Sequence, residues 1–220
     1  MNANYSHAQA RGFLSALLVG ILAAWACAPA AAAVHAEHSL RYVGWLGWKP
    51  VTVEVTLRER PGGVYEYREW IAPRWWAAIL GEGVARQTTL RTTGTDFRPV
   101  AHDSGTGSAS LADLEPGVVD LLSVRLEARA DLAMGRSEAR YRVWQEDGRI
   151  ETWTLELTGT DEVDTPDGRY QALTFRLGSD ARWIRGWSAP LLAFHFVRLE
   201  LWEEGSRVGS LDLESRELWE

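Results

Sequence analysis

The sequence predicts a mainly β protein: a curved antiparallel sheet that forms a barrel or spiral, with one helix around residues 118–132. Three observations support this fold class. Apolar and polar residues alternate with a period of two over most of the chain after residue 37. Turn residues separate the alternating runs, and a single segment has helical periodicity. Because the connections are short, we expect eight to ten strands, with neighbours running antiparallel.

The alternating runs give the expected strands in order. The clearest run is residues 51–57, where valine and leucine alternate with polar residues, and a turn at Pro61-Gly62-Gly63 leads to the second run. Asp147-Gly148 between two later runs is a strong hairpin signal. Residues 74–80 fit a short helix or an apolar loop, and residues 103–110 fit a flexible loop. The remaining expected strands are residues 64–71, 88–98, 140–145, 149–157, 171–177, 190–202 and 207–218.

The helix is expected after Pro116-Gly117, and Gly135 is a suitable residue to end it. Its apolar residues outline one face among charged neighbours. An acid and a serine three residues apart, Asp120 and Ser123, would satisfy exposed amide groups at the helix start. We expect these two residues and Arg129 to have structural roles, with Arg129 able to pair with a carboxylate of the sheet.

The acidic segment 161–168 could be a metal-binding loop or a turn between strands. Its three aspartates lie three residues apart, whereas a calcium loop needs ligands at alternate positions and a glutamate further on. Pro166 and Gly168 instead supply the backbone angles of a tight turn. The sequence therefore predicts a turn here, and it gives no indication of a metal or a cofactor.

Residues 1–36 have the layout of a secretory signal peptide, and residues 37–220 form a single predicted β-rich domain. The leader contains one formal charge, Arg11, then an apolar block and an alanine-rich tract ending at Ala36. The block is shorter than the roughly 20 residues of a membrane span, so we expect no transmembrane segment after cleavage. These features predict export to the periplasm.

The chain has a single cysteine, Cys27, within the predicted leader. Lipid attachment at Cys27 is an alternative to cleavage near Ala36, although the bulky Trp25 fits a lipid-attachment signal poorly. Cleavage downstream of Cys27 would leave a mature chain with no thiol, and therefore with no disulfide and no cysteine nucleophile.

Composition excludes one class of partner. The formal net charge is −7, and arginines and acids are interleaved along the chain. A nucleic-acid-binding protein would instead carry a basic stripe. We therefore expect no nucleic-acid partner.

Four motifs resemble the domain of unknown function 3108 family, a group of exported bacterial β-rich proteins. The motifs span most of residues 38–218, and the resemblance implies a periplasmic β-rich fold without implying a reaction. They are Gly44-Trp45-Leu46-Gly47, then Asp120-Leu121-Leu122-Ser123 with a later Arg129, then the segment from Thr165 to Ala172 that contains Pro166 and Gly168, and finally Trp187-Ser188-Ala189-Pro190.

Two histidines are candidates for chemistry. His102-Asp103-Ser104 contains the residue types of a hydrolase triad, but neighbours in an extended segment point to opposite faces, so we expect a polar segment beside a strand end. His195 shares its strand parity with apolar residues and should face inward. It could line a ligand cavity, act as a base or be a core histidine.

The twelve tryptophans could fill the core or form an apolar rim for a ligand, since indole offers a large flat face. We expect at least one of the adjacent Trp75 and Trp76 to be exposed as a contact surface. The ligand-lining candidates are His195, Trp75, Trp76 and Trp187.

The leading hypothesis is a non-enzymatic binding or scaffold domain of the cell envelope. It would hold an amphiphile such as a lipid, bind a glycan or contact an envelope protein. One alternative is an envelope hydrolase that uses His195 as general base with an acid from a neighbouring strand. Another is a purely structural partner protein without a small ligand.

Overall fold

The computed structural model describes residues 36–74, 83–93, 96–104 and 107–219. The first strands are β1 (His38–Leu46), β2 (Lys49–Arg60), β3 (Val64–Pro73), β4 (Val84–Thr93), β5 (Asp96–Asp103), β6 (Ser108–Ser110) and β7 (Val118–Asp120). After helix α2 (Ser123–Ala133) come β8 (Glu138–Trp144), β9 (Ile150–Thr165), β10 (Gly168–Gly178), β11 (Arg182–Ala189), the 3-10 turn η2 (Pro190–Leu192), β12 (His195–Glu203) and β13 (Ser206–Leu218).

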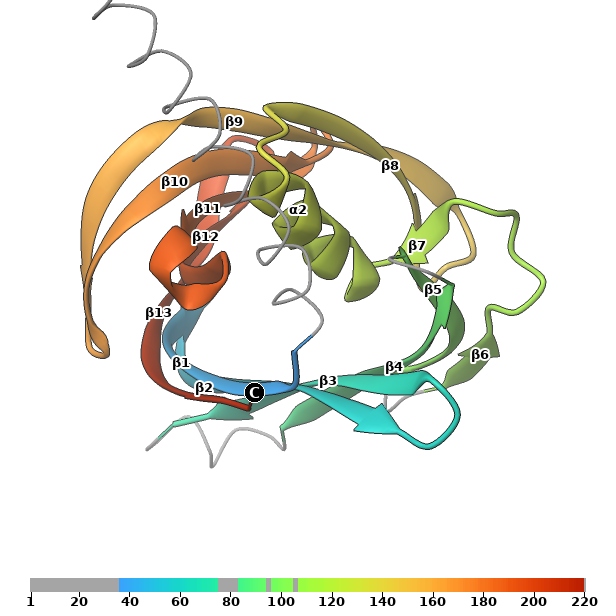
Figure 1. Cartoon of the computed structure of the whole chain (residues 1–220). Coiled ribbons are helices and arrows are strands. Elements are labelled where there is room, and N and C mark those ends of the chain that lie inside the picture. Colours follow the sequence, from blue (N-terminus) through green and yellow to red (C-terminus); the bar gives the residue numbers. More distant parts are fainter. Residues whose placement is uncertain (1–35, 75–82, 94–95, 105–106, 220) are drawn as a thin grey trace, which may run out of the picture.

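The described residues contribute thirteen strands to one curled sheet that does not close, in the order β6-β5-β4-β3-β2-β1-β13-β12-β11-β10-β9-β8-β7. This confirms the predicted fold class, although the expected strand number was too low. The sheet wraps around α2, and its two end regions, β5 and β7, come into contact (Figure 1). We call this junction between β5 and β7 the seam.

One pair of neighbouring strands is parallel. Val118–Asp120 of β7 pairs with β8 in parallel, while the other neighbouring pairs are antiparallel. The prediction that the helix starts at residue 118 is therefore wrong, because residues 118–120 are a buried strand and α2 begins at Ser123. Parallel neighbours need a crossover connection, and α2 provides it.

Several other boundaries differ from the expectation. The expected strand 88–98 covers the second half of β4 and the start of β5, and the expected loop 103–110 includes the short edge strand β6. The expected strand 190–202 begins with η2, because Ala193 and Phe194 have left-handed backbone angles that interrupt the extended chain. Strands β1 and β11 were not expected. The ambiguous residues 74–80 fall almost entirely outside the described part.

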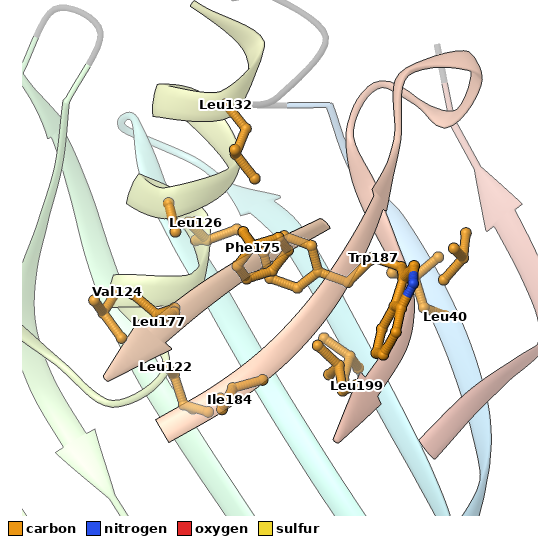
Figure 2. Close-up of a cluster of buried hydrophobic side chains, with 14 of the residues drawn as sticks. Leu40, Leu122, Val124, Leu126, Leu132, Phe175, Leu177, Ile184, Trp187 and Leu199 are labelled. Carbon is orange, nitrogen blue, oxygen red and sulfur yellow. The ribbon is translucent and has the colours of Figure 1, made fainter. Parts of the chain in front are cut away.

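Helix α2 lies inside the curled sheet, and none of its eleven residues is exposed. Leucines and valines of the helix pack against inward-facing residues of β10, β11 and β12 (Figure 2). The core is apolar at its centre, where Phe175 is fully buried and contacts Phe196. Because the sheet surrounds the helix, its polar residues Ser123, Arg129 and Asp131 are also buried and need partners within the protein.

The acidic segment forms a turn, as predicted. Thr165 and Gly168 are paired residues at the ends of β9 and β10, so Pro166 and Asp167 alone connect the two strands. The Asp167 carboxylate accepts hydrogen bonds from Tyr170 and Arg216. These contacts fix the turn against the end of β13.

Replacement of Gly186 by alanine tests the packing of β11 on the core. An added Cβ atom would lie 2.1 Å from Cζ of the buried Phe175. Overpacking of this kind costs about 1–3 kcal/mol, so we expect Gly186→Ala to lower the free energy of unfolding by that amount in urea titrations.

The matched control is Gly107→Ala, since no atom lies within 4 Å of a Cβ placed there. Equal stability of the two variants would contradict the packing described for Phe175.

Candidate functional site

Buried polar side chains join the two end regions of the sheet at the seam. His102 of β5 places Nδ1 2.8 Å from Oδ2 of Asp120 on β7, and Thr88 of β4 donates to the same oxygen. The backbone N–H and hydroxyl of Ser123 donate to Oδ1 of Asp120. All four side chains are buried. We call Thr88, His102, Asp120 and Ser123 the seam network.

The seam network holds Asp120 as a carboxylate. Burial alone raises the pKa of Asp120, but the hydrogen bonds from His102, Ser123 and Thr88 outweigh it and lower this pKa below its ordinary value. A carboxylate that accepts several hydrogen bonds is strongly favoured in its charged form. The expectation that Asp120 and Ser123 serve the start of the helix agrees with the contact from the Ser123 N–H.

A histidine, an acid and a serine do meet here, but not in the order that a hydrolase uses. Asp120 lies between His102 and Ser123, so the serine hydroxyl is bonded to the carboxylate instead of the imidazole. The acid and the serine of this network are therefore Asp120 and Ser123, and not the Asp103 and Ser104 that follow His102 in the sequence. His102 is the last residue but one of β5 and is 3% exposed, so it lies near the strand end but is buried within the strand and does not belong to the adjoining loop.

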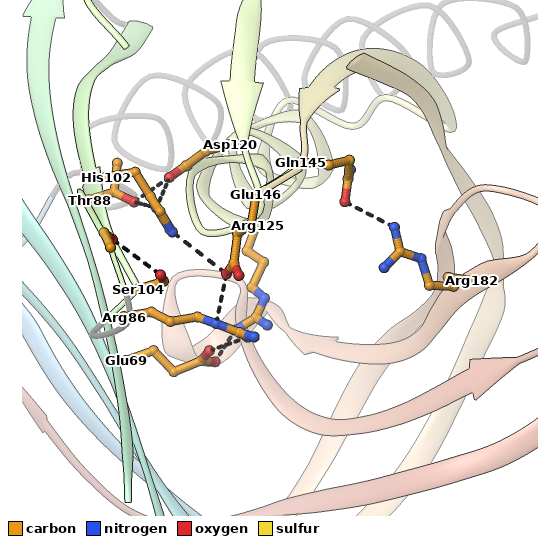
Figure 3. A network of polar contacts seen from close by, with 11 residues as sticks. Glu69, Arg86, Thr88, His102, Ser104, Asp120, Arg125, Gln145, Glu146 and Arg182 are labelled. Carbon is orange, nitrogen blue, oxygen red and sulfur yellow. Dashed lines mark hydrogen bonds and ion pairs between the residues drawn. The ribbon is translucent and has the colours of Figure 1, made fainter. Parts of the chain in front are cut away.

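Ion pairs extend from the seam network to Glu146, Arg86, Glu69 and Arg125 (Figure 3). Nε2 of His102 lies 3.8 Å from Glu146, and Glu146 lies 3.3 Å from Nε of Arg86. Arg86 and Arg125 both pair with the buried Glu69. Arg125 of the enclosed helix therefore has its charge balanced inside the protein.

His195 lies in the interior and lines the same small cavity as Glu69 and Arg125. It is 4% exposed, and its ring packs edge-on against His38 with the ring centroids 4.4 Å apart. Burial, followed by the charge of Arg129, lowers the pKa of His38 to about 3 and that of His195 well below its ordinary value. Both rings are therefore neutral at pH 7.

The cavity beside these histidines is small. Its volume is about 30 Å³, which admits water but no substrate. The inward orientation of His195 agrees with the expectation, and its burial makes it a core histidine beside a small, mainly apolar cavity. Arg129 lines the same cavity and donates from Nε to the carbonyl oxygen of Ala193 at 2.9 Å.

Two adjoining hollows lie at the start of α2. The first, about 220 Å³, is the tryptophan hollow, and the second, about 240 Å³, is the charged hollow. Arg86, Leu121 and Arg182 line both. The tryptophan hollow is also lined by Leu122, Arg125, Trp153, Trp183, Ile184, Leu201, Trp202, Glu203 and Val208. The charged hollow is also lined by Gln145, Glu146, Asp147 and Arg149.

The tryptophans of the first hollow come from three strands. Trp183 of β11 and Trp202 of β12 stack in parallel at 5.0 Å, and Trp153 comes from β9. Leu201 and Trp202 are consecutive in β12 and both line the hollow, as do the consecutive Trp183 and Ile184 of β11. The sequence analysis did not single out Trp183 or Trp202 as ligand-lining residues, because strict alternation predicts that only every second residue of a strand faces inward.

The other predicted site residues lie elsewhere. Trp187 is buried, donates to Asp161 at 3.4 Å and has Arg185 over its ring, and it lines neither hollow. Trp75 and Trp76 lie outside the described residues. Pro166 and Gly168 belong to the β9–β10 turn.

The hollows lie far from the start of the first strand. His38 begins β1 beside the cavity that Arg129 lines, in the second half of α2. The far end of β1 leads to Gly47, whose N–H donates to Val208, and Val208 lines the tryptophan hollow. The nine residues of β1 thus separate the hollows from the point where the preceding chain joins the sheet.

Neither a group of metal ligands nor a membrane-crossing helix occurs in the described ranges. No group of three or more histidine, cysteine, aspartate or glutamate residues there is arranged to hold a metal ion. Likewise, no helix among the residues described combines the length and apolarity needed to cross a membrane.

Sequence comparison does not assign the chain to a family. No model of a known protein family matches the sequence, and no curated protein matches it. The resemblance to the domain of unknown function 3108 family therefore stays a prediction.

Three solved structures are similar to this chain at low sequence identity. A β-barrel-like DUF1849 protein from Brucella abortus has a TM-score of 0.52 and 13% identity, covering 84% of this chain and 98% of that one. MucB, in the MucA/MucB complex of Pseudomonas aeruginosa, has a TM-score of 0.43 and 14% identity, covering 87% of this chain and 54% of that one. A Bacteroides fragilis protein with a YmcC-like fold, described as exported, has a TM-score of 0.36 and 13% identity, covering 82% and 95%.

Among these three structures, the similarity to the DUF1849 protein is the one that indicates the fold. At 13% identity it shows a common β-barrel-like fold and nothing about activity. The chain therefore has the fold of a β-rich bacterial protein of unknown function.

Replacement of Asp120 by asparagine tests the seam network. The amide cannot accept the two bonds that reach Oδ2, so buried donors lose their partner at a cost of about 1–3 kcal/mol. The pKa of Asp120 is lowered in the folded state, so its charge stabilises the protein above the unfolded pKa of about 3.8 and loses this effect as the pH falls through the lower folded value. We expect the difference in unfolding free energy between wild type and Asp120→Asn to shrink as urea titrations move from pH 7 to pH 3.

The control is Asp180→Asn, because Asp180 is fully exposed. A difference that stays constant across this pH range would contradict the charged state assigned to Asp120.

Proposed function

We propose that this protein is an exported, non-enzymatic binding protein of the cell envelope, and that it holds a small amphiphile in the two adjoining hollows at the start of α2. The observation that carries the proposal is that an apolar hollow and a charged hollow lie next to each other. One hollow has tryptophan and leucine walls, the other has charged walls, and they share Arg86, Leu121 and Arg182. A ligand with an apolar part and a polar part matches this division.

The size of the hollows fits a ligand that fills both. Small-molecule sites usually measure about 300–1,000 Å³, and each hollow alone is smaller than that. The stacked rings of Trp183 and Trp202 offer a large flat apolar surface. An aliphatic chain in contact with these rings would remove apolar surface from water, which is the main source of affinity in such sites.

Export supports the envelope location. The predicted leader at residues 1–36 is the basis for placing the domain outside the cytoplasm. The domain contains no cysteine after Cys27, so its fold is independent of the redox state of the compartment.

The hydrolase alternative has less support. It needs His195 in an open cleft with a carboxylate or hydroxyl in reach. His195 is instead buried beside a cavity of about 30 Å³ and is packed against His38. A contact with an envelope protein through Trp75 and Trp76 stays a separate prediction.

Titration with an eight-carbon amphiphile tests the proposal. We expect octanoate to bind the protein isolated after export, with heat measurable by isothermal titration calorimetry. Trp202→Ala should weaken this binding about 10-fold, or about 1.4 kcal/mol, since it removes one face of the hollow.

Trp48→Ala is the matched control, because Trp48 is 64% exposed and lines neither hollow. A protein that binds no eight-carbon amphiphile, whatever its polar group, and gives only the ligand-free mass in native mass spectrometry would rule the proposal out.

A further inference from the structure

The geometry points to an oxyanion, a carboxylate or a phosphate, as the polar end of the ligand, bound between Arg86 and Arg182 at the junction of the two hollows. This inference rests on the proposed function and specifies the ligand class for the same site.

Hydrogen-bond donors without acceptors gather on one hollow. Nε of Arg86, Nε of Arg125 and Nε1 of Trp202 are buried and make no hydrogen bond, and all three residues line the tryptophan hollow. A buried donor without a partner costs about 1–3 kcal/mol. A ligand group that only accepts hydrogen bonds would satisfy such donors, whereas an ammonium group would not.

Arg86 lies at the junction and is weakly held by the protein. Its Nε is 3.3 Å from Glu146, and its Nη1 is 3.8 Å from Glu69. Glu69 is bonded more closely to Arg125, so it serves two guanidinium groups at once. Glu69 is therefore shared between two guanidinium groups, and the other acid near Arg86, Glu146, is 40% exposed.

Arg182 presents two more donors. Its hydrogen bonds to Gln145 at 3.0 Å and to Glu151 at 3.3 Å both leave from Nη2. Nε and Nη1 are therefore available to a ligand. Guanidinium groups present parallel N–H donors that match the two oxygens of a carboxylate or a phosphate.

The charges around the hollows favour an anion. Four arginines and three acids line them, and Arg149 is occupied by Asp147 at 2.7 Å. The side chains that face the junction from β4 and β11 are guanidinium groups; Glu69 and Glu146 pair with Arg86, and Glu151 lies 3.3 Å from Nη2 of Arg182. A cationic head group would lie against Arg86 and Arg182, and like charges at this distance repel.

Four ligands with the same eight-carbon chain separate the possibilities: octanoate, octyl phosphate, 1-octanol and octyltrimethylammonium. We expect calorimetry at pH 7.5 and low salt to give a Kd about 10-fold lower for the two anions than for 1-octanol. The ammonium compound should bind more weakly than 1-octanol. Tighter binding of octyl phosphate than of octanoate would identify phosphate as the preferred group, and the reverse order would identify carboxylate.

Arg182→Gln should reduce the preference for anions over 1-octanol to about 3-fold or less. Arg86→Gln should act in the same direction, and if it fails to fold, the half-exposed Arg182 decides the test. Arg41→Gln is the matched control, because Arg41 is also half-exposed and ion-paired, 2.9 Å from Glu214, but lines neither hollow.

The outcomes are distinguishable. If all four ligands bind the wild type with similar affinity, or if Arg182→Gln keeps the full preference for anions, the head-group assignment is overturned and the amphiphile site stands. If none of the four binds, the proposed function itself is overturned.

Discussion

The buried carboxylate of Asp120 is the contact on which the shape of this protein depends. A barrel normally closes when its first and last strands pair through backbone hydrogen bonds. Here β6 and β7 are the two ends of the sheet and do not pair. Closure depends instead on side chains, since His102 and Thr88 on one side of the seam and Ser123 on the other all bond to Asp120. The curl of the sheet and the start of the helix are fixed at the same atoms.

The enclosed helix imposes a second constraint. Arg125, Arg129 and Asp131 belong to α2 and lie inside the sheet, where an unpaired charge is very costly. Each has a partner: Glu69 for Arg125, the Ala193 carbonyl for Arg129 and Tyr141 for Asp131. The surroundings of the two ends of the helix also differ. One end borders the histidine cavity, and the other borders the hollows with their unsatisfied donors.

The strands could largely be predicted from the sequence because a half-buried strand shows a local alternation of apolar and polar residues. The alternation at residues 51–57 and the Pro166–Gly168 turn each depend on neighbours along the chain, and both are found in the structure. The helix was also predicted, but not its start. Residues 118–120 were included in the helix because an apolar run before a helix does not reveal that it pairs with a strand 24 residues later.

The site could not be predicted in the same way, because it depends on contacts between distant segments. His102 and Asp120 are separated by a loop and by the whole curl of the sheet, so their spacing carries no signal. Arg86, Arg182 and Trp202 come together only once the order of β4, β11 and β12 around the helix is known. Leu201 and Trp202 are consecutive in β12 and both line the hollow, which a strict inward and outward alternation does not predict. Local periodicity therefore predicted most of the strands but not the residues that line the hollows.

The position of His38 has a consequence for how the molecule would be oriented in the envelope. The polypeptide before it joins the sheet beside the second half of α2, and the hollows open at the opposite end, a strand length of about 30 Å away. If Cys27 carries a lipid, the tether joins the sheet at this end of β1, away from the hollows. A guest molecule would then enter and leave from the water side, without the protein having to detach from the bilayer.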